Sequence, residues 1–76
     1  MKFETDCLYK ITFLDHAIGD KGVVTCIVVG WVIEQDKEQV TLSYWIVETD
    51  DKELRDNNLE PVSIIKSTIL KIRQIK

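Results

Sequence analysis

The residues of this chain that could do chemistry are one histidine, His16, and two cysteines, Cys7 and Cys26. A thiol nucleophile needs a base beside it and a further group that orients that base. A zinc site usually takes its ligands in closely spaced pairs of cysteine or histidine. The sequence contains neither pattern. We therefore expect two small buried cysteines, a histidine that caps its loop, no metal, no cofactor and no enzymatic activity.

A second group of candidates consists of two aromatic residues and the acidic residues that follow them. Period-two alternation predicts a strand over Gln39–Glu48, with Tyr44 on its inner side and Trp45 on its outer side. An outward indole could anchor a protein partner or stack on a base. The alternative interpretation is that Trp45 is buried under the polar loop. The candidate partner-binding residues are Trp45, Asp50, Asp51, Glu53 and Asp56, the four acids steering a basic partner.

A third group is basic and lies near the C-terminus. If Lys71 and Arg73 share an outward face, the domain is basic at one edge and acidic at the loop of residues 49–60. Such charges protect an exposed edge strand from aggregation. In the alternative, the edge pairs with a second copy, and the opposite charges favour head-to-tail contact. The candidate residues for binding a nucleotide or RNA are Tyr44, Trp45, Lys66, Lys71 and Arg73.

Composition restricts the classes of function. The 76 residues suffice for one domain, and the hydrophobic content of 45% argues against disorder. The net charge of −3 argues against duplex DNA as a partner, because phosphate neutralisation supplies much of that affinity. No apolar run reaches the roughly 20 residues of a membrane span, and no signal peptide precedes the chain. We expect a cytoplasmic protein with reduced thiols, although spacing leaves a Cys7–Cys26 disulfide open.

The first strand that would hold these residues is Cys7–Asp15, preceded by a segment, Met1–Asp6, that we expect to fray. Alternation predicts that one side of the strand faces the core. The residues on that side are Tyr9, Ile11 and Phe13. Glycines then predict a loop over His16–Gly22, since glycine adopts positive φ angles without strain.

The segment Val23–Glu34 is apolar on both sides, and it is joined to Gln39–Glu48 by a polar hairpin loop. We expect a long second strand that bends and is buried on both faces. Gly30 inside it indicates a bulge or a sharp bend. The inner set of the following strand is Val40, Leu42, Tyr44 and Ile46, and the outer set is Thr41, Ser43, Trp45 and Val47.

The C-terminal third begins with the acidic loop of residues 49–60. Within it, Asp51–Asp56 predicts a helical turn that a left-handed Asn57 or Asn58 would end. Pro61 opens the next strand, and a polar break at residues 66–68 predicts a 3₁₀ turn before a last strand, Ile69–Ile75. A helix over residues 63–74 is the competing interpretation. The β-branched residues and the preceding proline favour strands.

This order of elements resembles the five-stranded SH3-like and Sm-like small barrels over essentially the whole chain. The segment Ile64–Ile69 is similar to the strand–turn–strand that ends Sm-like proteins of the bacterial RNA-chaperone type, with Lys66 matching the lysine of their Tyr-Lys-His triplet. A second resemblance is to small uncharacterised bacteriophage proteins. The matching residues are Phe13–His16, Cys26–Trp31 and Ile65–Ile72.

The sequence thus predicts an all-β, single-domain, five-stranded SH3-like (Sm-like) barrel. The predicted function is that of a non-enzymatic protein-interaction module, encoded by a phage and acting in the host cytoplasm if the second resemblance holds. It would bind a host or partner protein through its acidic loop and exposed aromatic side chains. The alternative function is an Sm-like homo-oligomer that binds RNA or a small nucleotide.

Overall fold

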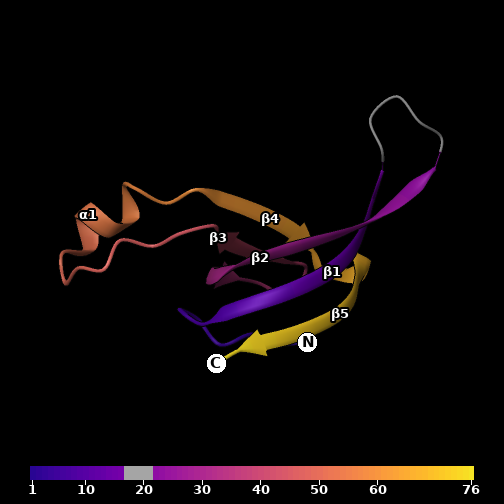
Figure 1. The fold of residues 1–76 in the computed structure, drawn as a ribbon, viewed down its shortest axis with the longest axis horizontal. Helices are drawn as coiled ribbons and strands as arrows, with labels where there is room; N and C mark the ends of the chain where they lie inside the picture. Colours follow the sequence, from indigo (N-terminus) through magenta and orange to yellow (C-terminus); the bar gives the residue numbers. More distant parts are fainter. Residues whose placement is uncertain (17–21) are drawn as a thin grey trace.

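The computed structural model describes residues 1–16 and 22–76 and contains one antiparallel sheet with strand order β4-β3-β2-β1-β5 (Figure 1). Its elements are β1 (Leu8–His16), β2 (Val23–Gln35), β3 (Gln39–Ser43), α1 (Lys52–Asp56), β4 (Pro61–Ile65), the 3₁₀ turn η1 (Lys66–Thr68) and β5 (Ile69–Ile75). The predicted all-β class with five strands is confirmed. However, β4 and β5 remain the two edges, so the sheet is not closed into a barrel.

One face of the sheet carries the core, and we call it the inner face. Ile11 of β1 lies opposite Val28 of β2, and both side chains are buried. The buried hydrophobic residues are Phe3, Tyr9, Ile11, Val28, Val32, Val40, Leu42 and Ile64. The predicted core side of β1 is therefore confirmed, and Phe13 packs against this cluster from its partly buried position.

The N-terminal segment is part of the core rather than a frayed end. The ring of Phe3 is buried and meets the ring of Tyr9 edge to face, with centroids 5.0 Å apart. The side-chain amide of Gln35 donates to the carbonyl of Phe3 and accepts its N–H. The ammonium of Lys66 donates to the carbonyl of Met1 and lies 5.7 Å from the centre of the Phe3 ring. The prediction of fraying is wrong because these polar contacts hold a large apolar side chain over the core.

The second strand is buried on one face, not on both. Val28 and Val32 lie on the inner face and are buried, whereas Ile27 and Val29 are 61% and 45% exposed. The described residues leave the outer side of this strand uncovered at Ile27 and Val29. The apolar residues on both sides of the strand predicted a second layer packed on its outer side. The described structure contains no such layer.

Gly30 is required by close packing and not by a bulge. The strand register shifts between Val32 and Glu34, beyond the glycine. A Cβ atom on Gly30 would lie 2.7 Å from the carbonyl oxygen of Ser43 and 3.2 Å from Cβ of Leu42. Only glycine lets β2 approach the end of β3 this closely.

The third strand ends at Ser43, well before its predicted end at Glu48. Val40 and Leu42 are buried as predicted, but Thr41 and Ser43 are buried as well. Tyr44, assigned to the inner set, is 50% exposed. The inner assignment of Tyr44 is therefore wrong, because the chain leaves the sheet after Ser43.

The C-terminal elements follow the prediction closely. The carboxylate of Asp51 accepts the N–H of Leu54 and caps α1, and Pro61 opens β4. The C-cap of α1 is Asn57 with φ −80°, and among the described non-glycine residues only Asp6 has a positive φ, so the predicted left-handed end at Asn57 or Asn58 is wrong. The strands β4 and β5 around η1 exclude the competing helix over residues 63–74. His16 ends β1, and the rest of the predicted loop, residues 17–21, lies outside the described residues.

We expect Gly30→Ala to lower the free energy of unfolding by about 1–3 kcal/mol, because the new methyl group overlaps backbone atoms that cannot move aside easily. Urea denaturation followed by circular dichroism measures the change. Thr25→Ala, at an exposed position of the same strand, is the control. Equal stability of the two variants would contradict the packing role of Gly30.

Candidate functional site

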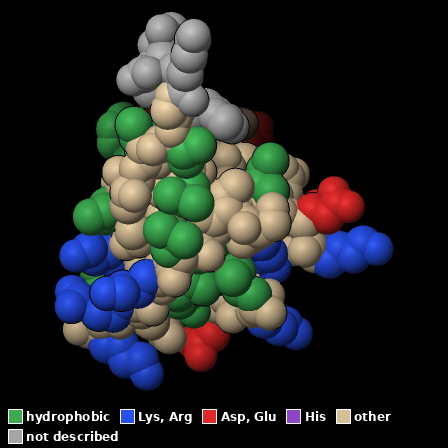
Figure 2. All heavy atoms as spheres, turned by 90° about the vertical axis from the view of Figure 1, so that its right-hand side faces the viewer, with side chains coloured by type: hydrophobic (Ala, Val, Ile, Leu, Met, Phe, Trp, Pro, Cys, Tyr) green, Lys and Arg blue, Asp and Glu red, His purple; other side chains and the backbone are tan. Residues whose placement is uncertain are grey.

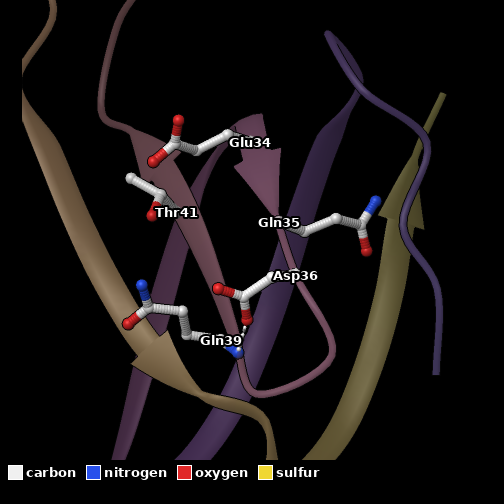
Figure 3. Close-up of a pocket in the computed structure, with 5 residues that line it drawn as sticks. All are labelled: Glu34, Gln35, Asp36, Gln39 and Thr41. Carbon is white, nitrogen blue, oxygen red and sulfur yellow. Dashed lines mark hydrogen bonds between the residues drawn. The ribbon is translucent and has the colours of Figure 1, made fainter.

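A polar hollow lies at the β2–β3 hairpin and is lined by Glu34, Gln35, Asp36, Gln39 and Thr41 (Figure 3). The carboxylate of Asp36 accepts the backbone N–H groups of Glu38 at 2.8 Å and Gln39 at 2.9 Å. These two hydrogen bonds lower the pKa of Asp36. Gln35 points away from the hollow, toward the N-terminal segment. The polar groups here build the hairpin, so we do not take the hollow as a ligand site.

Of the residues that could do chemistry, the structure describes the side chains of the two cysteines. Cys7 and Cys26 are free, half-buried thiols. Desolvation, helped by the neighbouring carboxylate of Glu4, raises the pKa of the Cys7 thiol. A nucleophilic cysteine needs the opposite shift. Within residues 1–16 and 22–76, no three His, Cys, Asp or Glu side chains are placed to hold a metal ion.

Residues 44–60 leave the sheet between β3 and β4, and we call them the acidic arm. They contain six acidic and two basic residues, a net charge of −4. The buried hydroxyl of Ser43 closes the base of the arm, because it donates to the carbonyl of Trp45 and accepts the N–H of Glu60. The N–H of Tyr44 also donates to the carbonyl of Glu60. Figure 1 shows α1 projecting from the sheet at one end of the molecule.

The arm presents apolar surface among its charges. Trp45 is 53% exposed, and its indole N–H donates to the carbonyl of Asn58 at 2.6 Å. Tyr44 and Leu54 are similarly exposed. The sequence left open whether Trp45 is exposed or buried under the polar loop, and in the structure its ring is exposed. A hydrogen bond within the arm fixes the orientation of the ring.

The acidic residues of the arm differ in what they already bind. Lys52 lies 2.6 Å from the carboxylate of Asp56 and lowers the pKa of that group through its hydrogen bond. Arg55 forms ion pairs with Asp6 and Asp56. Asp51 is used as the cap of α1.

Two predicted partner-binding acids are left, Asp50 and Glu53. Both are exposed, and neither takes part in the ion pairs formed within the described parts of the chain. Among the predicted partner-binding acids, they are therefore the carboxylates best able to meet a partner's cations.

A second surface covers the outer side of β5, β1 and β2, and we call it the outer face. Lys10 lies between Arg73 and Val29 across the sheet, and Thr12 lies between Lys71 and Ile27. Directly opposed residues project from the same face, so these side chains form one surface. Five of them, Lys10, Thr12, Ile27, Lys71 and Arg73, line a shallow hollow. Figure 2 shows Lys and Arg side chains gathered at one edge of the molecule beside hydrophobic ones.

The structure does not bring the predicted nucleotide-binding residues together. Tyr44 and Trp45 belong to the arm, whereas Lys71 and Arg73 lie on the outer face. Lys66 binds the carbonyl of Met1 and the side-chain oxygen of Gln35. Sequence reasoning missed Lys10, although the alternation of β1 places it on the side away from the core.

Known proteins provide no template for these surfaces. The chain matches no model of a protein family, no curated protein and no solved structure. None of its described helices is long and apolar enough to cross a membrane. The geometry of the arm and of the outer face must therefore support any functional conclusion.

We expect Ser43→Ala to loosen the base of the arm. The change leaves the carbonyl of Trp45 and the N–H of Glu60 without their buried partner, at a cost of about 1–3 kcal/mol. Hydrogen exchange should accelerate at the amide of Glu60. Ser67→Ala, at an exposed position of η1, is the control. Unchanged exchange at Glu60 would show that the hydroxyl does not hold the arm.

We also expect the stability contributed by Asp36 to depend on pH. Because the folded state lowers its pKa below 3.8, this stability is present above that value and is lost as pH falls through the folded pKa. The stability difference between wild type and Asp36→Ala should therefore shrink from about pH 5 to about pH 2. Asp36→Asn, which keeps an acceptor oxygen but does not titrate, is the control. A difference that stays constant over this range would rule out the linkage.

Proposed function

We propose that this chain is a non-enzymatic protein-interaction module that binds a basic partner through its acidic arm. We also propose that the open sheet is a variant of the SH3-like or Sm-like small barrel. The strand order, the 3₁₀ turn between β4 and β5 and the long second strand support that assignment.

The observation that carries the proposal is the orientation of Trp45. Its ring is half exposed, yet the hydrogen bond to Asn58 holds it in place. A fixed aromatic ring loses little conformational entropy on binding, and tryptophan is among the commonest energetic anchors of protein interfaces. The neighbouring Tyr44 and Leu54 add apolar area to the same arm.

The charge of the arm determines the chemistry of the partner. Asp50 and Glu53 are exposed, whereas the arm's own cations, Lys52 and Arg55, already form ion pairs. A partner that offers lysine or arginine beside an apolar pocket would match both features. Charge complementarity of this kind raises the association rate and makes it sensitive to salt.

The alternative function, an Sm-like oligomer that binds RNA or a nucleotide, has one observation in its favour. Lys10, Lys71 and Arg73 lie together on the outer face. Base stacking, however, needs an exposed aromatic ring next to such cations. The exposed aromatic side chains Tyr44 and Trp45 lie in the arm instead, so we favour the protein partner.

We expect Trp45→Ala to weaken binding of the partner by roughly 30-fold, the effect of losing an anchor worth about 2 kcal/mol. Trp45→Phe keeps a ring but loses the hydrogen bond to Asn58. Its affinity for the partner should lie between the affinities of wild type and Trp45→Ala. The partner is captured from a lysate of the source organism on immobilised wild-type protein. It is then titrated against each variant by calorimetry at low and high salt.

The double variant Asp50→Lys/Glu53→Lys should abolish the salt-sensitive part of the binding. Glu34→Lys/Glu38→Lys, with the same change of charge at the β2–β3 hairpin, is the matched control and should bind normally. Retained affinity in Trp45→Ala, or equal losses in the two double variants, would refute the arm as the binding surface.

A further inference from the structure

The outer face is a cationic surface whose charges form no ion pair with other described residues of the chain. Lys10 lies directly opposite Arg73, a like-charge neighbour that is unfavourable across a sheet. None of the ion pairs within residues 1–16 and 22–76 includes Lys10, Lys71 or Arg73. An anionic partner would remove this repulsion.

The outer face also carries exposed apolar side chains. Ile27 is 61% exposed and Val29 is 45% exposed, beside the cations of β1 and β5. A matching ligand therefore needs carboxylates next to large apolar groups. A nucleic acid fits less well, because Trp31 is half-buried and the chain as a whole carries net charge −3.

The acidic arm of this chain has the required composition. Asp50 and Glu53 supply exposed carboxylates that form no ion pair with other described residues, and Trp45 supplies an exposed ring whose orientation is fixed. Figure 1 shows α1 projecting beyond the sheet at one end of the molecule. The ion pair between Arg55 and Asp6 ties the arm to the segment before β1, and Ile27 and Val29 of the outer face stay exposed.

We propose that the acidic arm of one copy docks on the outer face of a second copy. The carboxylates of Asp50 and Glu53 meet Lys71 and Arg73, and Trp45 packs on Ile27 and Val29. The inference rests on the proposed function, because it identifies a second copy of this chain as a partner of the arm.

The contact is head-to-tail, since different surfaces of the two copies meet. Such contacts close into rings or extend into chains, depending on the rotation between neighbours. A 17-residue arm on three strands makes a small interface, so association is weak and falls with salt. This contact leaves the hydrogen-bonding edges of β4 and β5 free.

Sedimentation velocity over a range of protein concentrations, at low and high salt, tests the contact. The arm variant Asp50→Lys/Glu53→Lys and the face variant Lys71→Glu/Arg73→Glu should each be monomeric, because like charges then meet. Mixed in equal amounts, the two variants should associate again, since each reversed surface now has a complementary partner. Association of Glu34→Lys/Glu38→Lys should match that of wild type.

Other outcomes overturn the proposal in distinguishable ways. A wild type that stays monomeric at low salt excludes the contact, while the capture experiment with a basic partner still tests the arm. Association that is lost in the arm variant but kept in the face variant places the arm on a different surface. Association kept in both variants points to edge pairing of β4 with β5. If the face variant instead loses affinity for a fluorescent oligouridylate, the outer face belongs to RNA.

Discussion

The buried hydroxyl of Ser43 is the group on which both the sheet and the acidic arm depend. Ser43 ends β3, pairs with Pro61 at the start of β4, and places its carbonyl against Gly30 of β2. Its hydroxyl bonds to Trp45 and Glu60, the two sides of the arm's base. A hydroxyl can donate and accept at once, and a buried backbone group without a partner is costly. One small polar side chain therefore ends a strand and sets the direction in which the arm leaves the sheet.

The N-terminal segment compensates for the incomplete closure of the sheet. Phe3 fills space over the inner face, and the segment is tied to β2 through Gln35 and to η1 through Lys66. Gln74 of β5 adds a hydrogen bond to Glu4. A chain of this length has a small core, so covering it with the terminus adds buried apolar area that the five strands alone lack.

Local patterns predicted most of the strands because each signal acts over a few residues. The alternation of β1, the proline that opens β4 and the break before β5 all depend on side chains close together in sequence. The end of β3 was missed because Tyr44–Val47 continues the strand-like pattern, whereas the hydrogen bond between Ser43 and the distant Glu60 cannot be read from that pattern. Burial of β2 on one face was missed because composition cannot show whether a covering layer exists.

The candidate surfaces likewise combine features that the sequence predicts with features that only the folded structure shows. Trp45 and the acids of the arm were recognised from residue types, but which acids form ion pairs depends on contacts both near and far in the sequence. Arg55 reaches Asp6, far away in sequence, and Lys52 neutralises Asp56. Lys10 joins Lys71 and Arg73 only through the pairing of β1 with β5.

The final distribution of charge is therefore a property of the fold. The cations of the arm are used internally, and so its free carboxylates lie at one end of the molecule. Lys10, Lys71 and Arg73 of the sheet form no ion pair with another described residue, and they lie beside exposed valine and isoleucine. Separate surfaces of opposite charge, each with apolar area, are the feature on which the proposed binding through both surfaces rests.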